Sequence, residues 1–64
     1  MEHKILGTAE VAEMVGVTEA TLRQWRSKGT GPLSYKLGAK IAYDHADVIE
    51  WIEYRKEQTM KGGN

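Results

Sequence analysis

Residues 18–29 combine apolar, amide, hydroxyl and cationic side chains. If this stretch is helical, a rotation of roughly 100° per residue places Leu22 and Trp25 on one face. The opposite face then carries small or hydrogen-bonding side chains, namely Ala20, Gln24 and Ser27, with Arg23 and Lys28 at its edges. Small residues permit close approach to a major groove, where Gln or Arg can read base edges. An ordinary amphipathic surface helix has the same pattern.

The charges of the chain are separated along the sequence. Nine basic and nine acidic residues give a formal net charge of zero, which by itself argues against a nucleic-acid ligand. Yet no acidic residue lies between Glu19 and Asp44, and this central segment holds the cations Arg23, Arg26, Lys28, Lys36 and Lys40. The acidic residues lie on both sides of it. This polarised distribution favours binding of a polyanion by the central segment.

Composition and length exclude several classes of protein. Sixty-four residues form one domain near the size at which a hydrophobic core is only just sufficient. Without cysteine there is neither a disulfide nor a cysteine-based zinc site, and His3 and His45 belong to no ligand-spaced cluster, so we expect no metal and no cofactor. No apolar run approaches the roughly 20 residues of a membrane span, and no signal peptide is recognisable. We expect a soluble cytoplasmic protein.

We also expect no enzymatic activity. Asp44, His45 and Asp47 come nearest to a catalytic group, but they fall in one helical turn, and helix capping already accounts for the two aspartates. No glycine-rich phosphate loop appears. So small a domain is also unable to enclose a water-excluding pocket on the order of several hundred Å³.

Two short helices joined by a tight turn are predicted in the first half of the chain. Thr8 is placed to cap a helix over residues 9–15, and Gly16 follows where a left-handed C-terminal residue is needed. Gly16, Val17 and Thr18 form the joint, with Thr18 capping the second helix. This order is the helix-turn-helix pattern, whose second helix conventionally reads the groove. A plain helical hairpin is the alternative.

A β-hairpin is predicted after the second helix. Residues 29–32 form a turn with two glycines and the only proline. Residues 33–36 and 40–43 have the pattern of short strands around a glycine-containing loop. Lys36 and Lys40 flank its tip, as in a wing that reaches a phosphate backbone or a minor groove. The alternative is a solvated hairpin whose lysines discourage edge pairing.

A third helix closes the predicted fold. Asp44 and Asp47 resemble a capping box ahead of a helix that runs to Arg55. The apolar stripes of the helices predict a core built around two indoles, with the members Trp25, Trp51, Leu22, Val11, Val15, Ile41, Val48 and Ile52. The sequence predicts a single domain over residues 1–64, ordered over about 5–56 and frayed over 57–64.

Several stretches occur in a fixed order over nearly the whole chain between Leu6 and Arg55, namely residues 6–12, 16–18, 21–25, 28–29, 31–32, 35–38 and 43–52. In this order they resemble the small MerR-like winged-helix domains of phage excisionases and AlpA-type regulators. The resemblance implies a small α+β fold, a winged helix-turn-helix with a two-stranded wing and a C-terminal helix.

The resemblance also implies a function. Such proteins bind short sites on double-stranded DNA, often as neighbouring copies, and bend the duplex. Excisionases, which are recombination directionality factors, thereby direct a phage integrase toward excision inside the bacterial host, and they carry out no chemistry themselves. On this chain the implied base contacts are Ala20, Gln24 and Ser27. The implied backbone contacts are Thr18, Thr21, Arg23, Arg26 and Lys28, and the implied wing residues are Tyr35, Lys36, Gly38 and Lys40.

One departure from the family pattern and two alternatives accompany this hypothesis. Several relatives carry consecutive arginines around the wing, where this chain has Lys40 among small and apolar residues, so we expect a weaker grip or backbone contact only.

An AlpA-like transcriptional regulator has the same fold and length. A winged helix that binds a protein partner is the alternative of another class, and it would expose apolar anchors in place of Ala20, Gln24 and Ser27.

Overall fold

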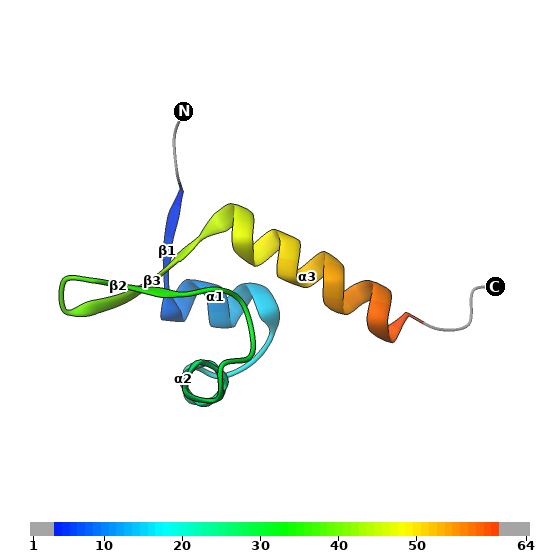
Figure 1. Ribbon diagram of the computed structural model, residues 1–64, viewed down its shortest axis with the longest axis horizontal. Helices are drawn as coiled ribbons and strands as arrows, with labels where there is room; N and C mark the ends of the chain where they lie inside the picture. Colours follow the sequence, from blue (N-terminus) through cyan, green and yellow to red (C-terminus); the bar gives the residue numbers. More distant parts are fainter. Residues whose placement is uncertain (1–3, 61–64) are drawn as a thin grey trace.

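Three helices pack with a three-stranded antiparallel sheet in the order predicted for a winged helix-turn-helix (Figure 1). The computed structural model describes residues 4–60. Its elements are β1 (Ile5–Gly7), α1 (Thr8–Val15), α2 (Glu19–Lys28), β2 (Tyr35–Leu37), β3 (Lys40–Asp44) and α3 (His45–Thr59). Within the described residues, no helix combines the length and the apolar composition that crossing a membrane requires.

The joint between α1 and α2 forms as local sequence dictates. Gly16 ends α1 with φ 85°, a left-handed conformation that favours glycine, and its N–H donates to the carbonyl of Ala12 at 2.8 Å. Thr18 then caps α2, because its Oγ1 accepts from the N–H of Thr21 at 3.1 Å. Gly29 ends α2 with φ 75°. These predictions are confirmed.

The start of α1 differs from the prediction by one residue. Gly7, in extended conformation, is the N-cap, and Thr8 is the first helical residue. The N–H of Gly7 donates to Oε1 of Glu10 at 2.9 Å. The carboxylate of Glu10, three residues later in the chain, therefore accepts from the N–H of the N-cap residue, and it also lies at the positive end of the helix dipole.

The sheet has one strand more than predicted. β1 pairs antiparallel with β3, so that the strand order is β1-β3-β2. Leu6 lies opposite Tyr43, and both are buried, whereas Ile5 is exposed. β2 begins two residues later than predicted, whereas β3 begins at Lys40 as predicted and ends one residue later; the turn between them has two residues, and its Gly38 has φ 67°. Glycine at the first central position is typical of a type II′ hairpin turn.

The core is centred on aliphatic side chains and one tyrosine. Its buried members are Leu6, Val11, Ala12, Leu22, Ala42, Tyr43 and Val48. The prediction of an indole-centred core is wrong, because Trp25 and Trp51 are only half-buried at its margin, with ring centroids 5.4 Å apart. Indoles are too large to be enclosed by so small a domain. Val15, Ile41 and Ile52 are likewise only partly buried.

The first turn of α3 is stabilised differently from the predicted capping box. Asp44 holds the N-cap position, but its side chain makes no cap hydrogen bond, and Oδ1 accepts instead from the hydroxyl of Tyr35 at 2.9 Å. The N–H of His45 donates to the carbonyl of Lys4 at 2.8 Å. The residue before β1 and the first residue of β2 are thus both tied to the beginning of α3.

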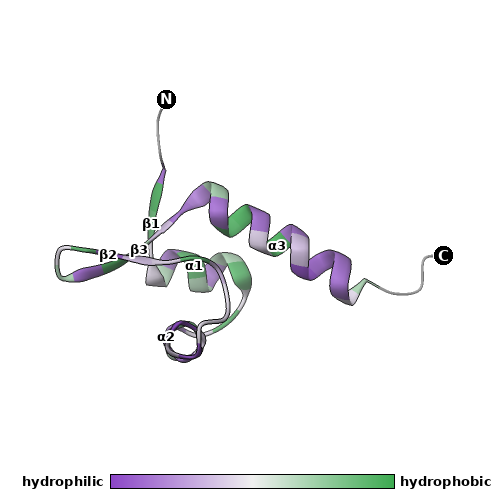
Figure 2. Cartoon of the chain, viewed as in Figure 1, coloured by the Kyte–Doolittle hydropathy of each residue, from purple (hydrophilic) through white to green (hydrophobic). Residues whose placement is uncertain are grey.

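α3 also extends beyond the predicted end at Arg55. The helix continues to Thr59, whose Oγ1 donates to the carbonyl of Arg55 at 2.9 Å. Its last turns are polar (Figure 2), which is why the apolar periodicity stops before the helix does. The rest of the predicted tail, residues 61–64, lies outside the described residues, as does His3.

We predict that Gly31→Ala destabilises the fold more than Gly29→Ala. Both glycines have left-handed φ, 80° and 75°, so each substitution carries a backbone cost of about 1–2 kcal/mol. A Cβ at Gly31 would also lie 2.9 Å from Cε3 of Trp25, whereas one at Gly29 meets nothing within 4 Å. Overpacking adds about 1–3 kcal/mol to the loss. Urea unfolding followed by circular dichroism measures both variants, and equal losses contradict the described packing of Trp25.

Candidate nucleic-acid interface

The outward face of α2 carries the residues predicted to contact bases. Leu22 is fully buried, so the helix is turned with its apolar side inward as predicted. Ala20, Gln24 and Ser27 are all exposed. In Figure 2 α2 is seen end-on and is largely purple, whereas α1 carries green segments. The second helix of the pair is therefore the one that offers a polar surface.

The cations of α2 are exposed, but they do not all lie on one side of it. Arg23 and Lys28 flank the outward face by the helical spacing, and both are exposed. Arg26, also exposed, lines a hollow of about 320 Å³ with loop residues 29–34. It lies near Tyr43: burial raises the pKa of that tyrosine above its ordinary value of 10.0, and the positive charge of Arg26 partly opposes the increase. Arg26 thus faces the hairpin side of α2.

Thr18 and Thr21, predicted to contact the DNA backbone, hydrogen-bond to each other. The hydroxyl of Thr18 donates to Oγ1 of Thr21 at 3.0 Å while its oxygen accepts the N–H of the same residue. The hydroxyl hydrogen of Thr21 is left for a further acceptor. Thr18 therefore has a structural role at the start of α2, and the two hydroxyls lie together there.

The wing residues are all exposed, and its two lysines lie on opposite faces of the ribbon. Lys36 is paired with Ile41 and Lys40 with Leu37, so the two-residue period of the strands directs them to different sides. Figure 1 shows the hairpin projecting from the body, with its turn at the outer end. Gly38 lies at this turn.

Tyr35 holds the base of the wing. Its hydroxyl donates to Asp44 across the β2–β3 pair, and this bond is the first cause of a pKa raised above 10.0, with smaller contributions from desolvation and the nearby carboxylates. The phenol is therefore already engaged within the fold. Sequence reasoning assigned Tyr35 to the wing but missed this bond, because Asp44 was assigned to capping.

Sequence reasoning also missed a surface feature at the indoles. The two indole rings line surface hollows together with Arg55. A prediction that buries Trp25 and Trp51 in the core does not include such hollows. The one feature of the sequence that indicates exposed indoles is the presence of two large tryptophan side chains in a chain of only 64 residues.

Two helices joined by a three-residue turn, followed by a β-hairpin wing and a closing helix, define a winged helix-turn-helix domain. Residues 5–56 match the family described as the helix-turn-helix domain, and the chain belongs to that family. Membership indicates DNA as the partner. Comparison with curated proteins and with solved structures finds no match.

We predict that Tyr35→Phe lowers stability near neutral pH and that this difference disappears at high pH. The folded-state pKa of Tyr35 is raised, so the stability contributed by its hydroxyl is fully present below the unfolded value of 10.0 and is lost as pH rises through the folded pKa. Urea unfolding of both proteins at about pH 8 and pH 11 measures this. Tyr54→Phe, on the exposed surface of α3, is the matched control. A difference that persists unchanged at high pH would contradict the bond to Asp44.

Proposed function

We propose that this protein is an architectural DNA-binding protein that acts as an excisionase, a recombination directionality factor. The observation that supports this proposal most directly is the outward face of α2, which is small and polar at its centre and cationic at its edges. Family membership supports DNA as the ligand. The excisionase role rests on the resemblance of the whole pattern to phage excisionases, and the protein acts on an integrase without catalysing a reaction itself.

In the proposed complex α2 lies in the major groove. Gln24 makes a bidentate contact to an adenine edge, and Ala20 and Ser27 allow the helix to approach the bases closely. Arg23 and Lys28 hold the phosphates on the two sides of the groove. Arg26 reaches a phosphate on the hairpin side, and Thr18 and Thr21 contact the backbone at the beginning of the helix.

The wing contributes positioning. Because Lys36 and Lys40 lie on opposite faces of the ribbon, they contact phosphates on the two sides of a narrow groove, while Gly38 keeps the tip small. Tyr35 supports the ribbon from its base through Asp44. Contacts by both α2 and the wing favour a bent duplex, because bending lets the DNA follow more of the protein surface.

The protein-interaction alternative needs apolar anchors on the outward face of α2. The large apolar side chains exposed in residues 4–60 lie elsewhere: they are Ile5, Met14, Leu33, Tyr35, Leu37, Ile49, Tyr54 and Met60. None belongs to α2. This distribution favours DNA over a protein as the partner of that face.

We predict that Arg23→Ala and Gln24→Ala weaken DNA binding in different ways. If the parent protein neutralises about five phosphates, a plot of log Kd against the logarithm of the salt concentration has a slope of about 4 to 5. Because Arg23→Ala removes one phosphate contact, it lowers this slope by about 1 on every DNA sequence. Gln24→Ala costs about 1–3 kcal/mol of binding free energy, mainly at the cognate site. Fluorescence anisotropy with a selected site and with a scrambled duplex measures both, with Gln58→Ala on α3 as control. Parental binding by both variants would overturn the assignment of α2.

We predict that the protein bends phage attachment-site DNA and raises the yield of excision by the integrase. Energy transfer between dyes at the duplex ends measures bending, and an in vitro assay with the integrase measures excision. Binding without bending and without an effect on excision would remove the excisionase role. If the protein then changed transcription of a neighbouring operon, the AlpA-like alternative would replace it.

A further inference from the structure

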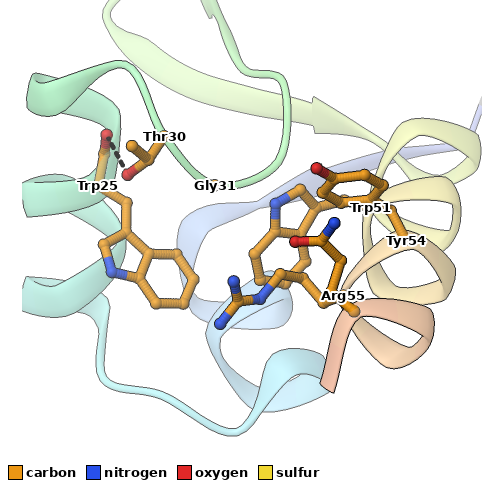
Figure 3. A pocket seen from close by; sticks show the side chains of 7 residues that line it. Trp25, Thr30, Gly31, Trp51, Tyr54 and Arg55 are labelled. Carbon is orange, nitrogen blue, oxygen red and sulfur yellow. Dashed lines mark hydrogen bonds between the residues drawn. The ribbon is translucent and has the colours of Figure 1, made fainter. Parts of the chain in front are cut away.

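The two indoles meet where α2 and α3 approach each other, and they are open to solvent on one side. Trp25 and Trp51 are tilted by 43° with ring centroids 5.4 Å apart, and both are only half-buried. The guanidinium carbon of Arg55 lies 5.7 Å from the Trp51 centroid, within cation–π range. Figure 3 shows these side chains around a hollow that Tyr54 and Gly31 border.

Two hollows share Trp25, Trp51 and Arg55 and together form what we call the indole groove. The first, of about 350 Å³, extends toward Thr30 and Gly31. The second, of about 410 Å³, extends toward the end of α1 and is bordered by apolar side chains, among them Met14 and Ile52. Trp, Tyr and Arg are the residues most enriched at binding hot spots, and methionine adapts to irregular partners.

The charges of α3 are divided between the groove and the opposite side. Its two cations, Arg55 and Lys56, line the groove. The glutamates of the helix, Glu50, Glu53 and Glu57, are exposed and repeat at the three- and four-residue spacing of a single separate face. Among the described residues, no acidic side chain borders either hollow. The groove therefore has an apolar floor and a positive rim.

We propose that the indole groove binds an acidic amphipathic helix of a partner protein. A helix laid in such a groove inserts apolar side chains one or two turns apart, and the two hollows on either side of the indole pair provide places for two of them. Glutamate or aspartate beside these anchors then faces Arg55 and Lys56. This surface is separate from the outward face of α2, since Trp25 lies on the opposite side of that helix from Ala20 and Ser27.

A partner protein fits this surface better than DNA or a second copy of the chain. Phosphates gain nothing from a floor of apolar side chains such as Met14 and Ile52. The acidic face of α3 in a second copy offers Ile49 and Tyr54 as apolar anchors. These two are five residues apart, or about 140° around the helix, so they are unable to enter one groove together.

The test uses intrinsic fluorescence, because both tryptophans of the sequence line the groove. The probe is a synthetic amphipathic helical peptide with leucines at i, i+4 and i+7 and flanking glutamates; the comparison peptide has lysine for every glutamate. We expect a saturable change in indole emission with the acidic peptide and binding weaker by about fivefold or more with the basic one.

Lys56→Glu weakens binding of the acidic peptide by about the same factor. Lys4→Glu, an equal change of charge on an exposed side chain outside the groove, leaves it unchanged.

Several results would overturn the proposal. These are no saturable change up to about 1 mM peptide, equal affinity for the two peptides, or equal effects of Lys56→Glu and Lys4→Glu. Displacement of the acidic peptide by a DNA duplex at low salt would assign the groove to DNA. A concentration-dependent dimer with the same change in emission would assign it to a second copy. The DNA affinity of Lys56→Glu is measured in parallel. If this variant still binds DNA like the parent, a negative result with the peptides counts against the indole groove and not against the proposed function.

Discussion

Complete burial of Leu22 determines which side of α2 faces outward. The side chain packs in one cluster with Val11 of α1, Tyr43 of β3 and Val48 of α3, so elements from the whole chain converge on it. Enclosing a leucine contributes about 1.5–3 kcal/mol. Rotating α2 by one residue would expose this side chain and bring Arg23 or Lys28 toward the core, depending on the direction, and an unpaired charge there costs far more than the burial gains. The rotation of the outward face is therefore strongly determined.

The sheet and α3 hold this arrangement together from the other side. β1 gives β3 a second neighbour, so the long wing strand is not left as half of an isolated hairpin. The beginning of α3 is tied to Lys4, the residue before β1, through His45, and to β2 through Tyr35 and Asp44. The wing and the core thus share one fixed junction, and the position of the wing relative to α2 follows from it.

Features specified by neighbouring residues were predictable from the sequence. The left-handed glycines at 16 and 29 and the cap at Thr18 need only local geometry, and the face of α2 follows from its periodicity. β1 was not predictable, because three residues show no alternation and the strand exists only through pairing with β3. The bond between Asp44 and Tyr35 was not predictable either. The local sequence around Asp44 indicates a helix cap, and only the folded hairpin brings the hydroxyl of Tyr35 within hydrogen-bond distance. The partial burial of the indoles depends on how much core the whole domain provides.

In the proposed complex, the outward face of α2 meets the duplex. Chemical-shift mapping of the ¹⁵N-labelled protein, titrated with a short DNA duplex at low salt, tests it most directly. We expect the largest changes on the amides of Ala20, Gln24 and Ser27, a second group at Lys36 and Lys40, and little change in the outer turns of α3. No change at any duplex concentration, or changes confined to α3 and the indole groove, would contradict it.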